Sequence, residues 1–241
     1  MPIPAVNAEK LGKKYGDFTA VGGLDLRIEE GEVFALVGPN GSGKSTTLKM
    51  ISTILFPTSG RVEVFGADTV GEPEKVRKTI SYLPEEAGAY KNLSGYEYLD
   101  FMAAVFLRDR EKAAAAFKYG SELSGLKDKL KDKIGTYSKG MTRKLLLSRA
   151  VMIRPRLAIL DEPTSGLDIV NGYEVRKTIK QLAKEGITFL ISSHNMLEIE
   201  FLSDRIAIIY KGEILACDTP GNLKKRFSTD NLEEVFIKLA Q

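Results

Sequence analysis

Residues 38–45 read Gly38-Pro39-Asn40-Gly41-Ser42-Gly43-Lys44-Ser45, between an apolar run at Val33–Val37 and a helical pattern from Thr46 to Ile54. They match the phosphate-binding pattern Gly-x-x-x-x-Gly-Lys-Ser/Thr in full. Glycines allow backbone N–H groups to converge on phosphate oxygens, and a helix offers its positive N-terminal end to an anion. We therefore expect Lys44 to contact the β- and γ-phosphates of a nucleotide and the Ser45 hydroxyl to coordinate Mg²⁺. A simple Gly-rich turn is the alternative, which the complete match in this context disfavours.

A pair of carboxylates, Asp161 and Glu162, ends the apolar run Leu157–Leu160. Ligands of doubly wound α/β sheets bind at the carboxyl ends of the strands, where acids can reach a nucleotide and its metal ion. We expect Asp161 to hold Mg²⁺, directly or through water, and Glu162 to polarise the attacking water. Either acid alone could instead cap a helix that starts near Ser165. The phosphate loop in the same chain favours the catalytic interpretation.

The only histidine, His194, follows another apolar run, Thr188–Ile191. A lone histidine is more often a surface or packed residue than a functional one. Its position at the end of a predicted strand, like that of the acid pair, reverses this expectation. His194 is therefore a candidate for the same site.

Apolar, β-rich runs alternate with helical patterns along the chain, which predicts an α/β fold with a largely parallel sheet. The predicted strands are Glu32–Val37, Arg61–Phe65, Thr79–Leu83, Leu157–Leu160, Thr188–Ile191 and Arg205–Ile209. Two earlier runs, Val6–Leu11 and Leu24–Ile28, predict an antiparallel β element laid over that sheet. A terminal helix that docks by one face is predicted from the spacing of Leu232, Val235, Phe236 and Leu239.

Between Pro84 and Pro155 the pattern changes to helices without strong strands, at Ser94–Leu107, Glu111–Leu123 and Lys139–Ile153. These helices could simply cover the sheet as crossovers, but three consecutive helices exceed what one parallel connection requires. We expect a single domain over residues 1–241. Within it, residues 1–84 and 156–241 form a nucleotide-binding core with the β element, and residues 85–155 form an inserted helical subdomain.

Composition narrows the class of protein. The 241 residues are 43% apolar, enough for a substantial core, and 35 basic against 32 acidic residues give a net charge of +3 with no footprint for nucleic acid. The longest apolar runs fall far short of the roughly 18–20 residues of a membrane-spanning helix. The N-terminus lacks the order of a secretory signal, and the single cysteine, Cys217, fits a reducing compartment.

One further motif, Tyr137-Ser138-Lys139-Gly140-Met141, ends twenty residues before Asp161. A Ser-x-Gly motif that opens a helix, between a phosphate loop and Leu-Asp-Glu-Pro, resembles the signature of the ABC ATPases. The resemblance runs from Lys14-Tyr15-Gly16 to the terminal helix, and it implies the P-loop NTPase core of that family. It also implies that Tyr15 stacks on adenine and that His194 contacts the γ-phosphate and orients the hydrolytic water.

The resemblance further implies a site shared between two subunits. Ser138 and Gly140 would bind the γ-phosphate of ATP held by the other subunit, from the N-terminus of a helix. Ser165-Gly166-Leu167-Asp168 would connect the two sites, with Asp168 near the facing phosphate loop, although Asp168 could also cap a helix. The residues expected to bind ATP are Tyr15, Gly38, Pro39, Asn40, Gly41, Ser42, Gly43, Lys44, Ser45, Thr46, Ser138, Gly140 and Asp168.

Two departures from the commonest family pattern lie near the γ-phosphate. The signature has Lys139 and Met141 where the family usually has glycine and glutamine, and Glu85 replaces the glutamine that senses Mg²⁺. A carboxylate still suits a hard cation, so Ser45, Asp161 and Glu85 are the expected metal ligands. Both variants resemble the branch of ABC ATPases that serves ABC-2-type exporters. This implies ATP hydrolysis, with Glu162 and His194 as catalytic residues, that drives transport, and export rather than import.

The implied partners are an integral membrane transporter subunit and a second ATP-binding subunit, identical or different. The chain would then be cytoplasmic and peripheral on the inner face of the cell membrane, with no nucleic-acid partner. The membrane subunit would dock between Glu85 and the helix Ser94–Leu107. Aromatic residues gather there, and core packing is their alternative role, more for Phe101 than for the tyrosines; they are Tyr90, Tyr96, Tyr98 and Phe101.

Two other classes of protein compete with this interpretation. A soluble ABC protein that acts on ribosomes or DNA would need no membrane partner, but such proteins usually have two ATPase halves, coiled-coil insertions or metal-binding cysteines. A kinase or other phosphotransferase with a phosphate loop would leave Ser138, Gly140 and His194 unexplained. Co-purification with a membrane protein separates the first class from a transporter.

Overall fold

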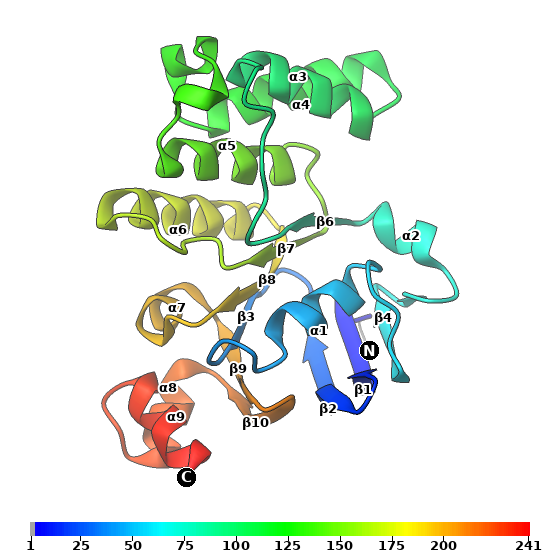
Figure 1. Cartoon of the computed structure of the whole chain (residues 1–241), viewed down its shortest axis with the longest axis vertical. Helices are drawn as coiled ribbons and strands as arrows, with labels where there is room; N and C mark the ends of the chain where they lie inside the picture. Colours follow the sequence, from blue (N-terminus) through cyan, green and yellow to red (C-terminus); the bar gives the residue numbers. More distant parts are fainter. Residues whose placement is uncertain (1–2) are drawn as a thin grey trace.

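The computed structural model describes residues 3–241 and contains two β-sheets with helices packed around them (Figure 1). The larger sheet has six strands in the order β10-β9-β3-β8-β7-β6. β3, β6, β7, β8 and β9 run parallel to their neighbours, and β10 pairs antiparallel with β9. The strands are β3 Val33–Val37, β6 Ile80–Leu83, β7 Leu157–Asp161, β8 Thr188–Ser193, β9 Arg205–Tyr210 and β10 Glu213–Asp218. The predicted α/β fold with a largely parallel sheet is confirmed.

The smaller sheet is antiparallel, with the order β2-β1-β4-β5. Its strands are β1 Val6–Tyr15, β2 Phe18–Ile28, β4 Ser59–Val64 and β5 Ala67–Asp68. The predicted antiparallel element is therefore present, and its first two strands are longer than predicted. The run Arg61–Phe65, by contrast, is not part of the parallel sheet that the alternation predicted. It forms most of β4, because after α1 the chain turns back and pairs with β1, with Val64 opposite Val6.

The two faces of the parallel sheet bury two different cores, and β3 contributes to both by strict alternation. Phe34 and Leu36 pack toward the antiparallel sheet and helix α1, Lys44–Ile51. Val33, Ala35 and Val37 pack in the second core, with the remaining long helices. A strand that is buried on both faces reads as a continuous apolar run, which is how the sequence presents it.

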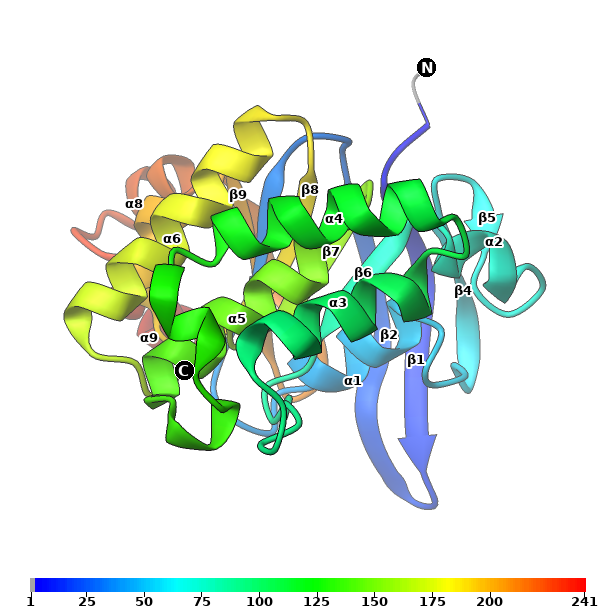
Figure 2. The same cartoon turned by 90° about the horizontal axis from the view of Figure 1, so that it is seen from above.

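Three α-helices lie between β6 and β7, as predicted, with two short 3₁₀ turns at Lys127–Lys131 and Ile134–Thr136. They are α3 Gly95–Phe106, α4 Arg110–Leu123 and α5 Lys139–Val151. Figure 2 shows α3 and α4 side by side. Helix α5 lies between this pair and the strands β6 and β7 (Figure 1).

The remaining helices are α2 Pro73–Arg77, α6 Ile169–Lys184, α7 Met196–Leu202, α8 Pro220–Phe227 and α9 Leu232–Ala240. The terminal helix predicted from Leu232 to Leu239 is α9, and Leu232 and Val235 are its buried residues. In residues 3–241, no helix combines the length and the apolar character needed to cross a membrane.

The aromatic residues near α3 differ from the prediction. Phe101, which was the expected core residue, has 47% of its surface exposed, whereas Tyr98 is 2% exposed. The buried face of α3 consists of Tyr98, Leu99 and Ala103, and Phe101 projects from another side of the helix. Tyr90 and Tyr96 remain accessible, at 58% and 36%. The exposed aromatic residues are therefore Tyr90 and Phe101, with ring centroids 5.9 Å apart, and Tyr96, whose ring lies 6.0 Å from that of Phe117. Together, Tyr90, Tyr96 and Phe101 are called the aromatic patch.

Ser94 starts α3 with a capping box, in which its Oγ accepts from Glu97 N at 3.2 Å and the Glu97 carboxylate accepts from Ser94 N at 2.7 Å. We expect Ser94→Ala to lower the free energy of unfolding by about 1 kcal/mol, because an N-terminal N–H loses its acceptor. Urea unfolding measures the difference. Ser94→Asp retains an acceptor and is the matched control. Equal stability of the alanine variant and the wild type would contradict the capping role.

Candidate functional site

The phosphate loop connects the end of β3 to the start of α1 and is confined on both sides. A Cβ on Gly38 would lie 2.1 Å from the carbonyl oxygen of Ile209, at the end of β9. Gly43 has a φ of +105°, and a Cβ there would lie 2.6 Å from the carbonyl oxygen of Ala20. Only glycine fits either position without displacing backbone. The loop is thus held between β9 and β2, with its N–H groups at the carboxyl edge of the sheet.

Lys44 is buried beneath this loop. Its Nζ donates to the carbonyl oxygens of Gly38 at 2.7 Å and Pro39 at 3.1 Å, and lies 3.8 Å from Glu162 Oε1. Burial lowers the pKa of Lys44, and the nearby carboxylates, first that of Glu162, oppose this effect. An ammonium group has three donors, so two carbonyls leave one to contact an anion above the loop.

Asp161 lies at the end of β7, where several hydroxyl groups reach its carboxylate. Oδ1 accepts from Ser45 Oγ at 3.2 Å and also from Ser192 Oγ, while Tyr82 OH lies 3.5 Å from Oδ2. Burial, followed by the Asp161 charge, raises the pKa of Tyr82, so its phenol remains protonated and can donate. The adjacent hydroxyl of Ser45 and carboxylate of Asp161 are hard oxygen donors of the kind that Mg²⁺ takes together with phosphate oxygens and water.

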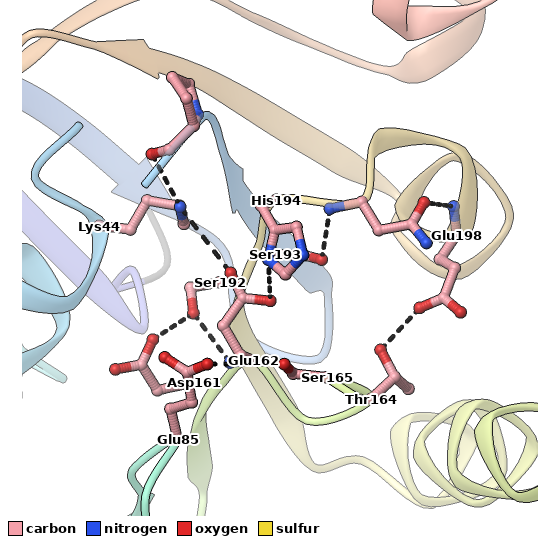
Figure 3. Close-up of polar contacts among 12 residues, drawn as sticks. Lys44, Glu85, Asp161, Glu162, Thr164, Ser165, Ser192, Ser193, His194 and Glu198 are labelled. Carbon is pink, nitrogen blue, oxygen red and sulfur yellow. Dashed lines mark hydrogen bonds and ion pairs between the residues drawn. The ribbon is translucent and has the colours of Figure 1, made fainter. Parts of the chain in front are cut away.

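Glu162 and His194 meet directly (Figure 3). His194 Nδ1 lies 2.9 Å from Glu162 Oε2, as the dashed line shows; the histidine side chain is 48% exposed and the glutamate side chain 5%. The other oxygen, Oε1, is buried without a hydrogen-bond partner in residues 3–241. Burial raises the pKa of Glu162, and the hydrogen bond and charge of His194 oppose this effect. A buried carboxylate with one oxygen held by a histidine and the other without a hydrogen bond can accept one from water.

Further contacts tie the helix after His194 to the loop after Glu162 (Figure 3). Thr164 Oγ1 donates to Glu198 Oε2 at 2.6 Å, and Arg176 donates to Glu198 Oε1 at 2.7 Å. Helix α7 carries Glu198, and Asn195 caps it by accepting from Glu198 N at 3.1 Å. Sequence reasoning did not find Glu198, because its partners come from other elements and its own segment reads as an ordinary amphipathic helix.

A cavity of about 300 Å³ opens above the phosphate loop. Tyr15, 49% exposed, and Phe18, 64% exposed, form its aromatic end, and Lys44 and Glu162 its polar end. Phe18 was not predicted from the sequence. The other lining residues are Ala20, Asn40, Gly41, Gly43, Ser45, Thr46 and Glu85. The cavity thus offers a flat ring at one end and phosphate-binding groups at the other.

Glu85 is exposed and lies at the rim of this cavity. Its Oε1 is 3.5 Å from Ser165 Oγ. No three carboxylate, histidine or cysteine side chains in the described part of the chain lie close enough together to hold a metal ion.

The predicted signature residues do not line the cavity. Ser138 caps α5 by accepting from Met141 N at 3.2 Å, and Gly140 packs so closely on Asn171 that a Cβ would lie 2.5 Å from that side chain. Asp168 caps α6 by accepting from Asn171 N at 2.9 Å. Ser138, Gly140 and Asp168 thus cluster around the starts of α5 and α6, apart from the chain's own phosphate loop.

Comparison with known proteins matches the family model described as "ABC transporter" to residues 21–165. The linearmycin resistance ATP-binding protein LnrL of Bacillus subtilis is 38% identical over 96% of this chain and 75% of its own length. The daunorubicin/doxorubicin resistance ATP-binding protein DrrA of Streptomyces peucetius is 37% identical over 96% of this chain and 70% of its own. A solved structure of an ATP-binding subunit of an ABC transporter is 26% identical, with a TM-score of 0.87, and covers 98% of this chain and 100% of its own.

The raised pKa of Glu162 predicts a pH-dependent cost to stability. An unfolded glutamate titrates near its ordinary value of 4.5, so the folded chain holds this proton more tightly. The stabilisation from this bound proton is fully present below about pH 4.5. It is lost as the pH rises through the raised pKa of Glu162 in the folded chain. We expect Glu162→Gln, without nucleotide, to be more stable than the wild type at about pH 8, and the gap to close toward pH 4.5. Thermal unfolding across pH measures this. A less stable variant at pH 8 would mean that the contacts with His194 and Lys44 outweigh burial.

Proposed function

This chain belongs to the ABC transporter family, and we propose that it hydrolyses ATP at the site built around Lys44 and Glu162 to drive transport through a separate membrane subunit. The observation that carries the proposal is the convergence of Lys44, Ser45, Asp161, Glu162 and His194 at one edge of the parallel sheet. These residues come from three separate segments of the chain, which follow or end the strands β3, β7 and β8.

The residues of the site suit in-line attack of water on the γ-phosphate. Tyr15 offers a ring for the adenine, and the phosphate loop with Lys44 holds the phosphates. Ser45 and Asp161 would hold Mg²⁺, which supplies charge neutralisation and orientation of the phosphates when it is bound. The unpaired Oε1 of Glu162 would accept a hydrogen bond from the water, while His194 fixes Oε2. We propose that Glu85, at the rim, responds to the metal-bound nucleotide.

A second ATP-binding subunit would complete the site. Ser138 already uses Oγ as the acceptor of its helix cap, so its O–H remains available to donate to an anion. The N-terminus of α5 adds a positive dipole end, and Lys139 a cation. Because Ser138 and Gly140 lie away from the chain's own cavity, we propose that they contact the γ-phosphate held by the partner, with Asp168 between the two sites. ATP would then form part of the interface.

Dimerisation is testable by sedimentation of Glu162→Gln with and without ATP and Mg²⁺. Slowed hydrolysis should preserve an ATP-held pair, so we expect the mass to double when both are added. Lys44→Ala is the control and should remain a monomer, because it loses a phosphate contact. A Glu162→Gln chain that binds ATP tightly but remains monomeric would contradict pairing of identical chains. Loss of ATP binding in that variant would contradict the assignment of the site.

The proposed transport partner is an integral membrane subunit, which would place this chain on the inner, cytoplasmic face of the cell membrane. Two of the relatives, LnrL and DrrA, are resistance ATP-binding proteins by name, which supports export as the direction. The exposed patch of Tyr90, Tyr96 and Phe101 lies on residues 85–155, which we propose act as the helical subdomain that receives the partner. Such accessible aromatics are typical of interface anchors.

Docking at this patch predicts that the double variant Tyr90→Ala, Tyr96→Ala loses its membrane partner. We expect affinity purification of the tagged wild-type chain from detergent-solubilised membranes to recover a membrane protein of several spans. The double variant should recover at least about tenfold less, since truncation of interface aromatics costs on the order of 2 kcal/mol or more. Phe201→Ala, on the exposed surface of α7, is the matched control. Undiminished recovery by the double variant would contradict docking at this patch.

A further inference from the structure

Arg143 lies on α5, five residues after Ser138, yet its side chain leaves the helix and enters the catalytic loop. It is 8% exposed. Nε donates to the carbonyl oxygen of Pro163 at 2.8 Å, and Nη2 donates to that of Asp161 at 2.9 Å and also to that of Glu162. One guanidinium thus gathers the carbonyls of three consecutive residues, among them the proposed catalytic glutamate.

The other arm of the same guanidinium reaches a second loop. Nη1 lies 3.3 Å from the carbonyl oxygen of Glu85 and 3.4 Å from that of Pro84, just after β6. β6 and β7 are neighbours in the sheet, with Leu83 opposite Leu160. Arg143 therefore links three parts of the structure: the helix that starts at Ser138, the loop with Glu85 and the loop with Glu162.

The conformation of the loop explains why such a link is needed. Glu162 has a φ of +49°, a left-handed backbone that is unfavourable for a non-glycine residue and persists only where its surroundings enforce it. The three carbonyl oxygens that face Arg143 carry partial negative charges, so they repel one another unless a hydrogen-bond donor lies between them. A lysine, with one nitrogen, could not serve both loops, whereas the planar fork of arginine can.

A charged guanidinium at the buried position of Arg143 is costly, because burial removes it from water. Within residues 3–241, the acceptors of Arg143 are all backbone carbonyls. Burial lowers the pKa of its guanidinium, although Glu85, Asp161 and Glu162 oppose this effect. Where only packing is required, a buried charge is commonly replaceable by an apolar side chain of similar volume. A buried arginine whose donors are directed at the loop of a reacting residue indicates a role in the placement of that loop.

We propose that Arg143 is a positioning residue that fixes the backbone of Glu162 and couples it to the helix that carries Ser138 and Gly140. This inference rests on the proposed roles of Glu162 and of the signature residues. Contact of Ser138 with the nucleotide of a partner would act on the same helix that holds Glu162 in place. ATP bound in the partner's site would thereby affect the position of this chain's Glu162 through the side chain of Arg143.

The test compares Arg143→Ala with the wild type in steady-state ATP hydrolysis and in binding of a fluorescent ATP analogue. We expect kcat to fall by about tenfold to a hundredfold, because a misplacement near 1 Å has an effect of this size, while nucleotide affinity changes less than about twofold. Arg143 lines a cavity of about 490 Å³, so added guanidinium ion can reach the vacated position and should restore part of kcat. A residue needed only for folding would not show this rescue.

The matched control is Arg156→Ala, at the opposite end of β7, where an exposed arginine pairs with Glu30 at 2.8 Å. It should keep wild-type kcat and show no response to guanidinium. If Arg143→Ala does not fold, Arg143→Lys keeps the cation but cannot serve both loops, and the same fall in kcat is expected. Wild-type kcat in a folded variant of either kind, or a fall in kcat of Arg143→Ala that guanidinium does not restore, would overturn the proposal.

Glu162→Gln, assayed in parallel, separates failure of this inference from failure of the proposed function. Slow hydrolysis by Glu162→Gln together with wild-type kcat in Arg143→Ala would reject the role of Arg143 alone. Wild-type hydrolysis by Glu162→Gln would reject the role of Glu162, and the positioning role of Arg143 with it.

Discussion

Parallel pairing of β3, β8 and β7 is the constraint on which the site depends. Val37 lies opposite Ser193, and Asp161 opposite Ser192, so the three strands end at nearly the same level. The residues that follow, Gly38, Glu162 and His194, therefore emerge side by side although they are far apart in the chain. Parallel strands align their carboxyl ends in this way. Helices cover one face of the sheet, and α1 with the antiparallel sheet covers the other, which keeps this edge in place.

Burial of charge is the second theme of the site. Lys44, Asp161, Glu162 and Arg143 are all buried, and their hydrogen-bond partners are backbone carbonyls, hydroxyls and one histidine, with one ion pair between Lys44 and Glu162 at 3.8 Å. Fixed dipoles around buried charges keep them oriented before any ligand arrives, which is the condition for strong electrostatic effects on a reaction. Glu162 has two features that selection for stability alone would avoid: its Oε1 has no hydrogen-bond partner in residues 3–241, and its backbone is left-handed.

Helix α5 connects the two halves of the proposed mechanism. Its first residues face outward, where Ser138 caps the helix, and its next turn sends Arg143 inward to two loops at the ends of β6 and β7. Helix α6 begins beside it, with Asn171 against Gly140, and α7 is tied to the loop between them through Thr164 and Glu198. Contacts of this kind connect the proposed signature residues, the proposed catalytic glutamate and the histidine through hydrogen bonds and packing.

The sequence by itself determined the α/β class, the phosphate loop and the acid pair, because those patterns are local: a glycine spacing, an apolar run, a helix that follows. The sequence did not determine which strands pair or which side chains meet when they are far apart in the chain. Arg61–Phe65 has the composition of any strand, and only pairing with β1 decides its sheet; likewise Phe101 and Tyr98 exchange roles once α3 packs. Arg143, Glu198, Ser192 and Tyr82 gain their meaning from atoms that lie 18 or more residues away in sequence, as in the bond from Arg143 to Asp161. Tertiary structure alone supplies such contacts, since hydrogen bonds act over about 3 Å in space whatever the separation along the chain.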